Sequence, residues 1–279
     1  MRNGRYISDY HCHSAVSPDG HSTMAEMARA AIEMGIDELC FTDHVEPVPW
    51  LRWNDGPLPL HSYDWSVMAQ DFAAAQRLYG DKIKLRMGAE LGEVVLAPDT
   101  EDSYLDDAPP LDFTIGSVHV FWRDGIIDDL CWIKSTDKAV WEQAVESYLT
   151  ELEKLVSWGR FSVIGHLTLP LRYAKELCGL ELDIRHHDER IRELLRRAID
   201  KGIGIELNTN RGNEPLPNEH WLKMYRSLGG EIITMGSDAH MPKHLSCAME
   251  SRQELLESCG FKYFTTFAEK KPIFHKLYH

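Results

Sequence analysis

Short apolar runs that end in polar residues recur along the chain, separated by longer segments with a different pattern. Seven such runs are present: YISDYHCH (6–13), ELCFTDH (38–44), IKLRMGAE (83–90), FTIGSVH (113–119), FSVIGH (161–166), GIGIELNTN (202–210) and EIITMGSDAH (231–240). Continuous apolar runs of this length are typical of strands buried on both faces. The pattern therefore predicts seven buried strands.

Most of the segments between these runs carry apolar residues at the spacing of amphipathic helices. In STMAEMARAAIEMG (22–35), Ser22 is a candidate N-cap and Gly35 a stop signal. Three more helices are predicted to end at glycines: WEQAVESYLTELEKLVSWG (141–159), DERIRELLRRAIDKG (188–202) and NEHWLKMYRSLGG (218–230). Strand then helix, seven times, predicts an α/β fold whose parallel sheet closes into a TIM-like (β/α)7 barrel rather than a doubly wound sheet. We expect a single domain across residues 1–279.

Three segments do not follow this scheme. Residues 46–65, EPVPWLRWNDGPLPLHSYDW, are rich in Pro and Trp and predict a long loop, either a lid or pocket wall or a surface loop pinned by buried tryptophans. Residues 96–112, LAPDTEDSYLDDAPPLD, predict an acidic, solvated connection. The last segment, FTTFAEKKPIFHKLYH (264–279), predicts a closing helix or tail.

Composition narrows the class of protein. The chain of 279 residues has a formal charge of −14, which argues against nucleic acid and anionic membranes as partners, although bound cations would still admit an anionic substrate. Six cysteines form no CxxC pair and are expected to be reduced thiols. The start MRNGRYISDYH does not resemble a signal peptide, and no apolar stretch approaches membrane-spanning length, so a cytoplasmic protein is expected. The oligomeric state stays open.

The polar residues at the strand ends carry the candidate chemistry. His11 and His13 alternate along a strand and so share a face, which makes them a metal half-site. Polar residues also close the other runs: Asp43, His44, Glu90, His119, His166, Asp238 and His240. In a barrel these ends meet at one mouth, where so much buried imidazole and carboxylate needs cations as partners. The mixed ligands suit zinc, manganese or iron, their number implies two or three ions, and Glu90 is the candidate bridging ligand.

The ordered set DYHCHS, FTDH, GAE, GSVH, GH and SDAH resembles the polymerase-and-histidinol-phosphatase (PHP) superfamily. The resemblance extends from Asp9 to Ala268 and is greatest to the histidinol-phosphate phosphatase branch, through FTDH, GH followed by Arg172, IELNTN and LGGEIITMGSDAH. It implies a distorted seven-stranded α/β barrel with a trinuclear metal centre.

The resemblance also implies roles for individual residues. The first metal would be held by His11, His13, Glu90 and Asp238, and Glu90 would bridge to a second metal on His119 and His166. A third would use His44, His240 and a ligand from the loop after the first strand. Asp19 takes that position in this chain, with His21 close by as the alternative.

The implied reaction is hydrolysis of a phosphomonoester, most simply L-histidinol phosphate in histidine biosynthesis, by metal-activated hydroxide attack on phosphorus. Asp238 or His240 would move the proton, and Arg172 and Arg211 would clamp the phosphate. Glu46 and Glu93 are either an acidic wall for the histidinol amine or solvent-facing residues.

Three other functions stay open at this point. The metal motifs also fit a phosphoesterase that acts on another phosphomonoester or a phosphodiester. A non-catalytic metal-binding barrel would be expected to lack ligands, and none is missing. A metal-dependent amidohydrolase also uses HxH at a strand end, but it would be expected to have a lysine ligand where this chain offers Glu90 and His119.

Overall fold

Seven parallel strands form the wall of a nearly closed barrel in the computed structural model, which describes residues 4–47 and 63–277. Each strand coincides with one of the seven predicted apolar runs, and only the strand at 84–92 continues past the end of its run, by two residues. In spatial order they are β1 (Ser8–Cys12), β2 (Glu38–Phe41), β4 (Lys84–Gly92), β5 (Phe113–Ser117), β8 (Val163–Ile164), β9 (Gly204–Asn208) and β10 (Ile233–Gly236). Nearly all their residues are buried, as expected for a sheet covered by helices outside and filled by side chains inside. The prediction of a TIM-like α/β barrel is confirmed.

The barrel closes between β1 and β10. Cys12 forms a parallel bridge with Ala239, which follows the end of β10. Asp238 donates its backbone N–H to the carbonyl of His11 over 2.8 Å, and His13 donates to the carbonyl of Ala239 over 2.9 Å. The closure thus runs through the same backbone segments that carry the predicted metal ligands.

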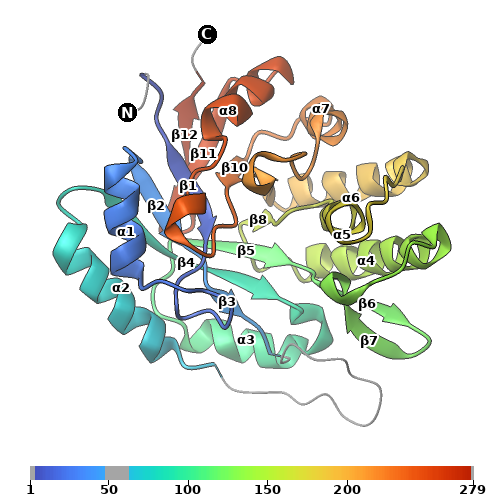
Figure 1. Cartoon of the computed structure of the whole chain (residues 1–279), viewed down its shortest axis with the longest axis horizontal. Helices are drawn as coiled ribbons and strands as arrows, with labels where there is room; N and C mark the ends of the chain where they lie inside the picture. The colour runs from blue at the N-terminus through green and yellow to red at the C-terminus, as the bar shows by residue number, and fades with distance from the viewer. Residues whose placement is uncertain (1–3, 48–62, 278–279) are drawn as a thin grey trace.

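Eight helices in the described part of the chain surround the strands (Figure 1). They are α1 (Met24–Glu33), α2 (Trp65–Tyr79), α3 (Pro98–Asp107), α4 (Lys138–Trp158), α5 (Leu169–Cys178), α6 (Asp188–Asp200), α7 (Glu219–Ser227) and α8 (Met249–Ser258). In α6 the buried residues Ile191, Leu194, Leu195 and Ala198 follow helical spacing and face the barrel. The predicted stops at Gly35, Gly159, Gly202 and Gly229 all have positive φ.

The predicted N-cap of α1 is off by one residue. The helix begins at Met24, and Thr23 rather than Ser22 caps it. The Thr23 hydroxyl accepts from the Glu26 backbone N–H, and the Glu26 carboxylate accepts from the Thr23 backbone N–H over 2.9 Å. This reciprocal pair satisfies two backbone donors, which a single hydroxyl at Ser22 would not do.

The prediction of a closing helix or tail at the C-terminus is wrong. Residues 263–276 form an antiparallel hairpin of β11 (Tyr263–Ala268) and β12 (Lys271–Lys276). Glu269 and Lys270 make the two-residue turn and both have positive φ, at 50° and 61°. Such a turn matches the twist of the two strands, and the Thr and Phe residues of β11 favour a strand.

Three further features were not anticipated. The acidic segment 96–112 contains helix α3, and Arg160 pairs with its Asp102 and Asp106. A second hairpin, β6 (Val120–Arg123) and β7 (Ile126–Asp129), follows β5 and leads to the site. The short strand β3 (His44–Val45) pairs with β4.

The proposed lid or pocket wall at 46–65 falls mainly on residues 48–62, which lie outside the described residues. Within the described ranges, no helix combines the length and the apolar character needed to span a bilayer.

Candidate metal centre

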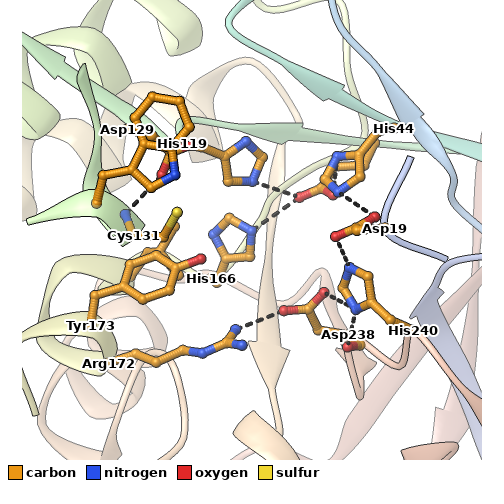
Figure 2. Close-up of a pocket in the computed structure, with 13 residues that line it drawn as sticks. Asp19, His44, His119, Asp129, Cys131, His166, Arg172, Tyr173, Asp238 and His240 are labelled. Carbon is orange, nitrogen blue, oxygen red and sulfur yellow. Dashed lines mark hydrogen bonds and ion pairs between the residues drawn. The ribbon is translucent and has the colours of Figure 1, made fainter. Parts of the chain in front are cut away.

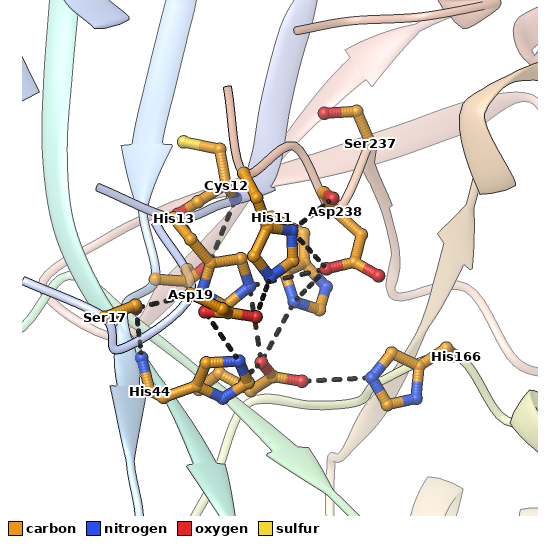
Figure 3. A network of polar contacts seen from close by, with 12 residues as sticks. His11, Cys12, His13, Ser17, Asp19, His44, His166, Ser237 and Asp238 are labelled. Carbon is orange, nitrogen blue, oxygen red and sulfur yellow. Dashed lines mark hydrogen bonds and ion pairs between the residues drawn. The ribbon is translucent and has the colours of Figure 1, made fainter. Parts of the chain in front are cut away.

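All nine predicted ligands lie around one point at the carboxyl ends of the barrel strands. Figure 3 labels six of them: His11, His13, Asp19, His44, His166 and Asp238. Glu90, near the end of β4, occupies the centre of this cluster. Its two carboxylate oxygens lie 3.0–3.5 Å from ring nitrogens of five histidines: His11, His13, His44, His119 and His166. Ser117 donates its hydroxyl to Glu90 Oε1 over 2.6 Å, which fixes the carboxylate further.

Four atoms form a first group with the spacing of metal ligands. His11 Nε2 lies 3.3 Å from Glu90 Oε2 and 3.7 Å from Asp238 Oδ1, and His13 Nε2 lies 3.5 Å and 3.4 Å from the same two oxygens. Ligands held about 2.0–2.2 Å from a tetrahedral zinc ion would be separated by about 3.3–3.6 Å. His11 Nε2, His13 Nε2 and Glu90 Oε2 are buried without hydrogen-bond partners, a costly arrangement that a divalent cation would relieve. The donor set therefore fits a metal ion.

Two further groups share residues with the first. His119 Nε2 and His166 Nε2 lie 3.4 Å and 3.0 Å from Glu90 Oε1, on the opposite side of the carboxylate from His11 and His13. Asp19, His44, His240 and His13 form the other group, whose candidate ligand atoms all lie within 4.8 Å of one another.

The loop after β1 contributes Asp19 to this last group. Asp19 Oδ2 lies 2.7 Å from His240 Nε2, whereas His21, the alternative residue in the loop, is exposed. None of the candidate clusters found within the described ranges includes His21. The geometry therefore favours Asp19 over His21 as the loop ligand.

Several histidines are oriented by hydrogen bonds from Nδ1, the ring nitrogen that faces away from the centre of the cluster. His11 Nδ1 lies 2.7 Å from Glu206 Oε1, and His13 Nδ1 lies 3.2 Å from the hydroxyl of Ser17. His119 Nδ1 lies 3.3 Å from Glu93 Oε2. A proton on each Nδ1 satisfies these acceptors and leaves Nε2 with its lone pair facing the centre, as a metal-binding imidazole requires.

Glu206 is the residue that the sequence analysis missed. It lies inside β9, is 1% exposed, and also accepts the backbone N–H of His166 over 2.8 Å. A Cβ on residue 236 would lie 2.2 Å from Glu206 Oε1 and 2.3 Å from His11 Cβ, so only glycine leaves room for this pair. The available signal was a carboxylate in the middle of the apolar run GIGIELN.

Glu46 and Glu93 also differ from the sequence-based hypothesis, which placed them at an acidic wall or in solvent. Both are buried, and they lie against His44 and His119: Glu46 Oε1 is 3.1 Å from His44 Nδ1, and Glu93 accepts the backbone N–H of His119 over 2.6 Å. Burial and the neighbouring Glu93 raise the pKa of Glu46. These carboxylates support the histidines.

Replacing Glu206 by Gln is expected to weaken metal binding by about 10- to 100-fold, because the amide orients His11 less firmly and leaves its imidazole less basic. Metal titration against a competing chelator measures this. Glu38→Gln is the matched control, since Glu38 is also a buried strand glutamate but pairs with Tyr6, Tyr10 and Arg86 at the start of β2. Equal metal affinity in Glu206→Gln and wild type would contradict the assigned role.

Two buried aspartates hold the loops that carry ligands. Asp43 accepts hydrogen bonds from the backbone N–H and hydroxyl groups of both Ser14 and Ser17, at 2.6–3.2 Å. Asp9 accepts from Ser237 and from the backbone N–H of Ser246, which fixes the turn after β10. The sequence analysis singled out Asp43 as a polar residue at a strand end, beside His44. In the structure it stabilises the loop after β1.

The charges of the cluster depend strongly on one another. Burial by itself would lower the pKa of His11, but Glu206, Glu90 and Asp238 raise it well above its usual value. Burial, with His44 and His240 close by, lowers the pKa of His13 to about 3. Although burial opposes it, the surrounding histidines hold the pKa of Glu90 well below its usual range. The ionised form of Glu90 is thus favoured and needs positive charge nearby, which protons on the imidazoles or bound cations supply.

A cavity of about 320 Å³ opens onto the cluster (Figure 2). Ligand candidates form one side of it, and the other side consists of Asp129, Cys131, Trp132, Leu169, Arg172 and Tyr173. Arg172 points from α5 toward the cluster, and its Nη1 lies 2.8 Å from Asp238 Oδ2. The volume suits a small molecule that places one end on the cluster.

The two predicted phosphate-binding arginines differ in position. Arg172 is 12% exposed and lines the cavity. Arg211 is 36% exposed, pairs with Glu176 over 2.7 Å, and does not belong to the described residues that line the cavity. Because Arg172 Nε also lies 3.7 Å from Glu176, that carboxylate connects the two arginines. A phosphate contact of Arg211 stays a prediction.

A parallel α/β barrel with a cluster of imidazoles and carboxylates at the carboxyl ends of its strands defines a class of metal-binding barrel proteins. The family model of the PHP domain matches residues 9–210, and the chain belongs to this family. A histidinol-phosphatase of Lactococcus lactis is 28% identical over 267 residues, which cover 94% of this chain and 95% of the relative. A probable histidinol-phosphatase of Thermotoga maritima is 25% identical over 271 residues, covering 94% of this chain and 96% of the relative.

Solved structures of related proteins have the same fold. The structure of histidinol phosphate phosphatase from Lactococcus lactis, complexed with zinc, L-histidinol and phosphate, superposes with a TM-score of 0.77 at 26% identity, covering 96% of this chain and 98% of that chain. A putative histidinol phosphatase from Listeria monocytogenes has a TM-score of 0.73 at 18% identity, over 88% of this chain and 99% of that chain, and shares the fold.

Proposed function

We propose that this chain is a metal-dependent phosphomonoesterase that hydrolyses L-histidinol phosphate to L-histidinol and phosphate. The observation that carries the proposal is the cluster of His11, His13, Glu90 and Asp238, whose ligand atoms lie at metal-ligand spacing and open to a cavity beside Arg172. In the first three residues these atoms are buried without a hydrogen-bond partner. The full-length similarity to the Lactococcus histidinol-phosphatase supports the choice of substrate.

The cluster would hold two to three divalent ions. His11, His13, Glu90 and Asp238 are the proposed ligands of the first, and Glu90 with His119 and His166 those of the second. Asp19, His44 and His240 would hold a third. Zinc, manganese and iron all accept this mixture of imidazole and carboxylate, and zinc is the ion in the Lactococcus complex.

Bound ions would supply an activated water near neutral pH and neutralise charge on the phosphate oxygens. The residues of the chain have three tasks around that chemistry. Arg172 binds phosphate oxygens from the side of the cavity opposite His44 and His240. Asp238 and His240 are the proposed residues for moving the proton. Both face the cavity, and Asp238 Oδ1 lies 3.8 Å from His240 Nδ1. The aromatic side chains of Trp132 and Tyr173 limit the water around the leaving group.

Replacing Arg172 by Ala is expected to raise KM for a phosphomonoester about 10- to 100-fold, because two charge-assisted hydrogen bonds to phosphate are lost. Arg172→Lys keeps the charge without the planar fork, so an intermediate KM is expected. Steady-state kinetics with the metal-loaded protein measure both. A KM that stays at the wild-type value in Arg172→Ala would contradict the phosphate contact.

The position of Asp129 in the cavity wall favours a substrate whose leaving group carries a positive charge. It lines the cavity at the end of β7 and caps the short 3₁₀-helix 130–132 by accepting the backbone N–H of Cys131 over 2.8 Å. Burial raises the pKa of Asp129, so a positively charged ligand group beside it would stabilise its ionised form. The ammonium group of histidinol is such a group.

Replacing Asp129 by Asn is expected to raise KM for histidinol phosphate about 10-fold while leaving KM for phenyl phosphate unchanged. Asn is as good an N-cap as Asp, so the substitution removes the charge and keeps the cap. Asp137→Asn at the exposed N-cap of α4 is the matched control. An equal change for both substrates would mean that Asp129 acts only on structure.

The function is tested by measuring phosphate release from the zinc- or manganese-loaded protein across histidinol phosphate, other phosphomonoesters and phosphodiesters. A kcat/KM for histidinol phosphate far above the others is the expected result. Slow, even release from all would retain the phosphoesterase and reject the substrate. No release from a metal-loaded protein would favour a non-catalytic barrel, and amide hydrolysis would favour an amidohydrolase.

A further inference from the structure

A second cluster of metal-ligating side chains lies on the outer surface of the barrel, away from the cavity. Glu142 comes from the first turns of α4, and His186 and His187 come from the 3₁₀-helix Arg185–His187 that leads into α6. Helices α4 and α6 pack beside each other on the outside of the barrel (Figure 1). His186 and His187 are adjacent in the sequence, but Glu142 lies 44 positions before His186. The fold therefore brings the glutamate to the two histidines.

The two imidazoles converge on one carboxylate oxygen. Nε2 of His186 lies 2.6 Å and Nε2 of His187 lies 2.9 Å from Glu142 Oε1. The candidate ligand atoms of the three residues lie within 4.8 Å of one another. An ordinary surface ion pair contains one histidine and one glutamate. Here two histidines present the same ring nitrogen, Nε2, to one carboxylate oxygen, which is an arrangement that can chelate a metal ion.

We propose that Glu142, His186 and His187 form a binding site for one divalent transition-metal ion, outside the catalytic cluster. Two imidazole nitrogens and one carboxylate oxygen are a ligand set that zinc accepts, with water in the fourth position. Calcium and magnesium prefer oxygen ligands, so the site selects against them.

The burial of the three residues suits this role. His187 is 7% exposed and therefore fixed in place, whereas Glu142 and His186 are 47% and 54% exposed and reachable by an ion from solvent. Ligands held about 2.0–2.2 Å from zinc in a tetrahedron lie about 3.3–3.6 Å apart, so the two exposed side chains need to move outward by about half an ångström or slightly more. Their exposure makes that movement possible without disturbing the core.

Neighbouring charges support the same geometry. Glu146, one turn along α4 from Glu142, lies 3.6 Å from Nδ1 of His187, so a second carboxylate faces the ring nitrogen that does not contact Glu142. Arg190 neutralises Glu146 over 2.6 Å and pairs with Glu153 as well. An ion bound here would tie the start of α6 to α4, and we expect it to stabilise that pair of helices.

The test is the zinc content of the full-length protein after dialysis against a zinc buffer, measured by mass spectrometry of the metal. His186→Ala is expected to contain one zinc ion fewer per chain than the wild type, with phosphatase activity unchanged. His220→Ala is the matched control, because His220 is also an exposed histidine paired with one carboxylate, Asp188, over 2.7 Å. It is expected to lose none.

A second measurement distinguishes a specific zinc site from adventitious binding of zinc. Added zinc is expected to raise the melting temperature of the protein with its catalytic cluster already loaded, and His186→Ala and Glu142→Gln are expected to abolish that rise. Equal zinc content in wild type and His186→Ala, or an equal rise in melting temperature, would overturn the proposal. Neither readout depends on the substrate or on turnover, so failure of the proposed function leaves this test unaffected.

Discussion

Replacing Glu90 by Gln is expected to lower kcat by at least about 10³-fold and to remove at least one metal ion per chain. Glu90 contacts five histidines with its two oxygens and is 1% exposed, so no water or neighbouring side chain can replace the lost negative charge. The amide of Gln can present one oxygen only, and its NH₂ group would face an imidazole or an ion. The bridge between the proposed first and second metals would therefore fail.

The measurement is kcat/KM together with metal content by mass spectrometry, on protein shown to be folded by its melting temperature. Glu151→Gln is the matched control, because Glu151 is a buried glutamate of α4 that pairs with Lys154 and does not contact the cluster. Activity within a few-fold of wild type in Glu90→Gln, with full metal content, would refute the central role of this carboxylate.

Removal of metal by a chelator is expected to abolish turnover and to lower the melting temperature. An ion present at 100 times its dissociation constant stabilises the folded state by about 2.7 kcal/mol. In a domain of this size that corresponds to about 5 °C for each ion lost. The physical cause is the cluster itself, since the buried Glu90 and the 11% exposed Asp238 then rely on protonated imidazoles for positive charge.

Differential scanning calorimetry before and after dialysis against chelator measures the shift, and readdition of zinc or manganese is expected to restore both activity and melting temperature. Glu90→Gln provides the control, because a protein with a damaged cluster should lose less stability on chelation than the wild type. Full activity in a protein proven free of metal would exclude metal-dependent hydrolysis and with it the proposed function.

Local sequence determined the strands, most helix ends and the positions of the candidate ligands. A buried parallel strand reads as a continuous apolar run, and its carboxyl end is marked by the first polar residues, as in GSVH before His119. Glycine needs no tertiary contact to end a helix, so Gly159 and Gly202 were correct stops. The alternation of His11 and His13 placed both rings on one face because side chains on a strand have a period of two.

Tertiary structure decided which polar residues support the ligands. Glu206, 195 positions from His11 in the sequence, meets it only because β9 and β10 bring its carboxylate inside the barrel next to Gly236. Asp9 and Asp43 likewise anchor loops through hydrogen bonds to distant residues: Asp9 bonds Ser237 across the closure between β1 and β10, and Asp43 bonds Ser14 beside the β1–β2 pair. Such partners leave no periodic signal in the sequence.

The remaining differences have the same cause. Whether FTTFAEKKPIF becomes a helix or a hairpin depends on two positive φ values at Glu269 and Lys270 and on a strand partner. Arg172 and Arg211 follow strands in similar ways, yet only Arg172 reaches the cavity, because α5 directs it there while Arg211 pairs with Glu176 outside. The sequence by itself therefore determined the barrel and the positions of the candidate metal ligands at the strand ends, which follow from short-range periodicity. Tertiary structure alone decided the supporting carboxylates and the cavity wall, since these depend on contacts between distant residues.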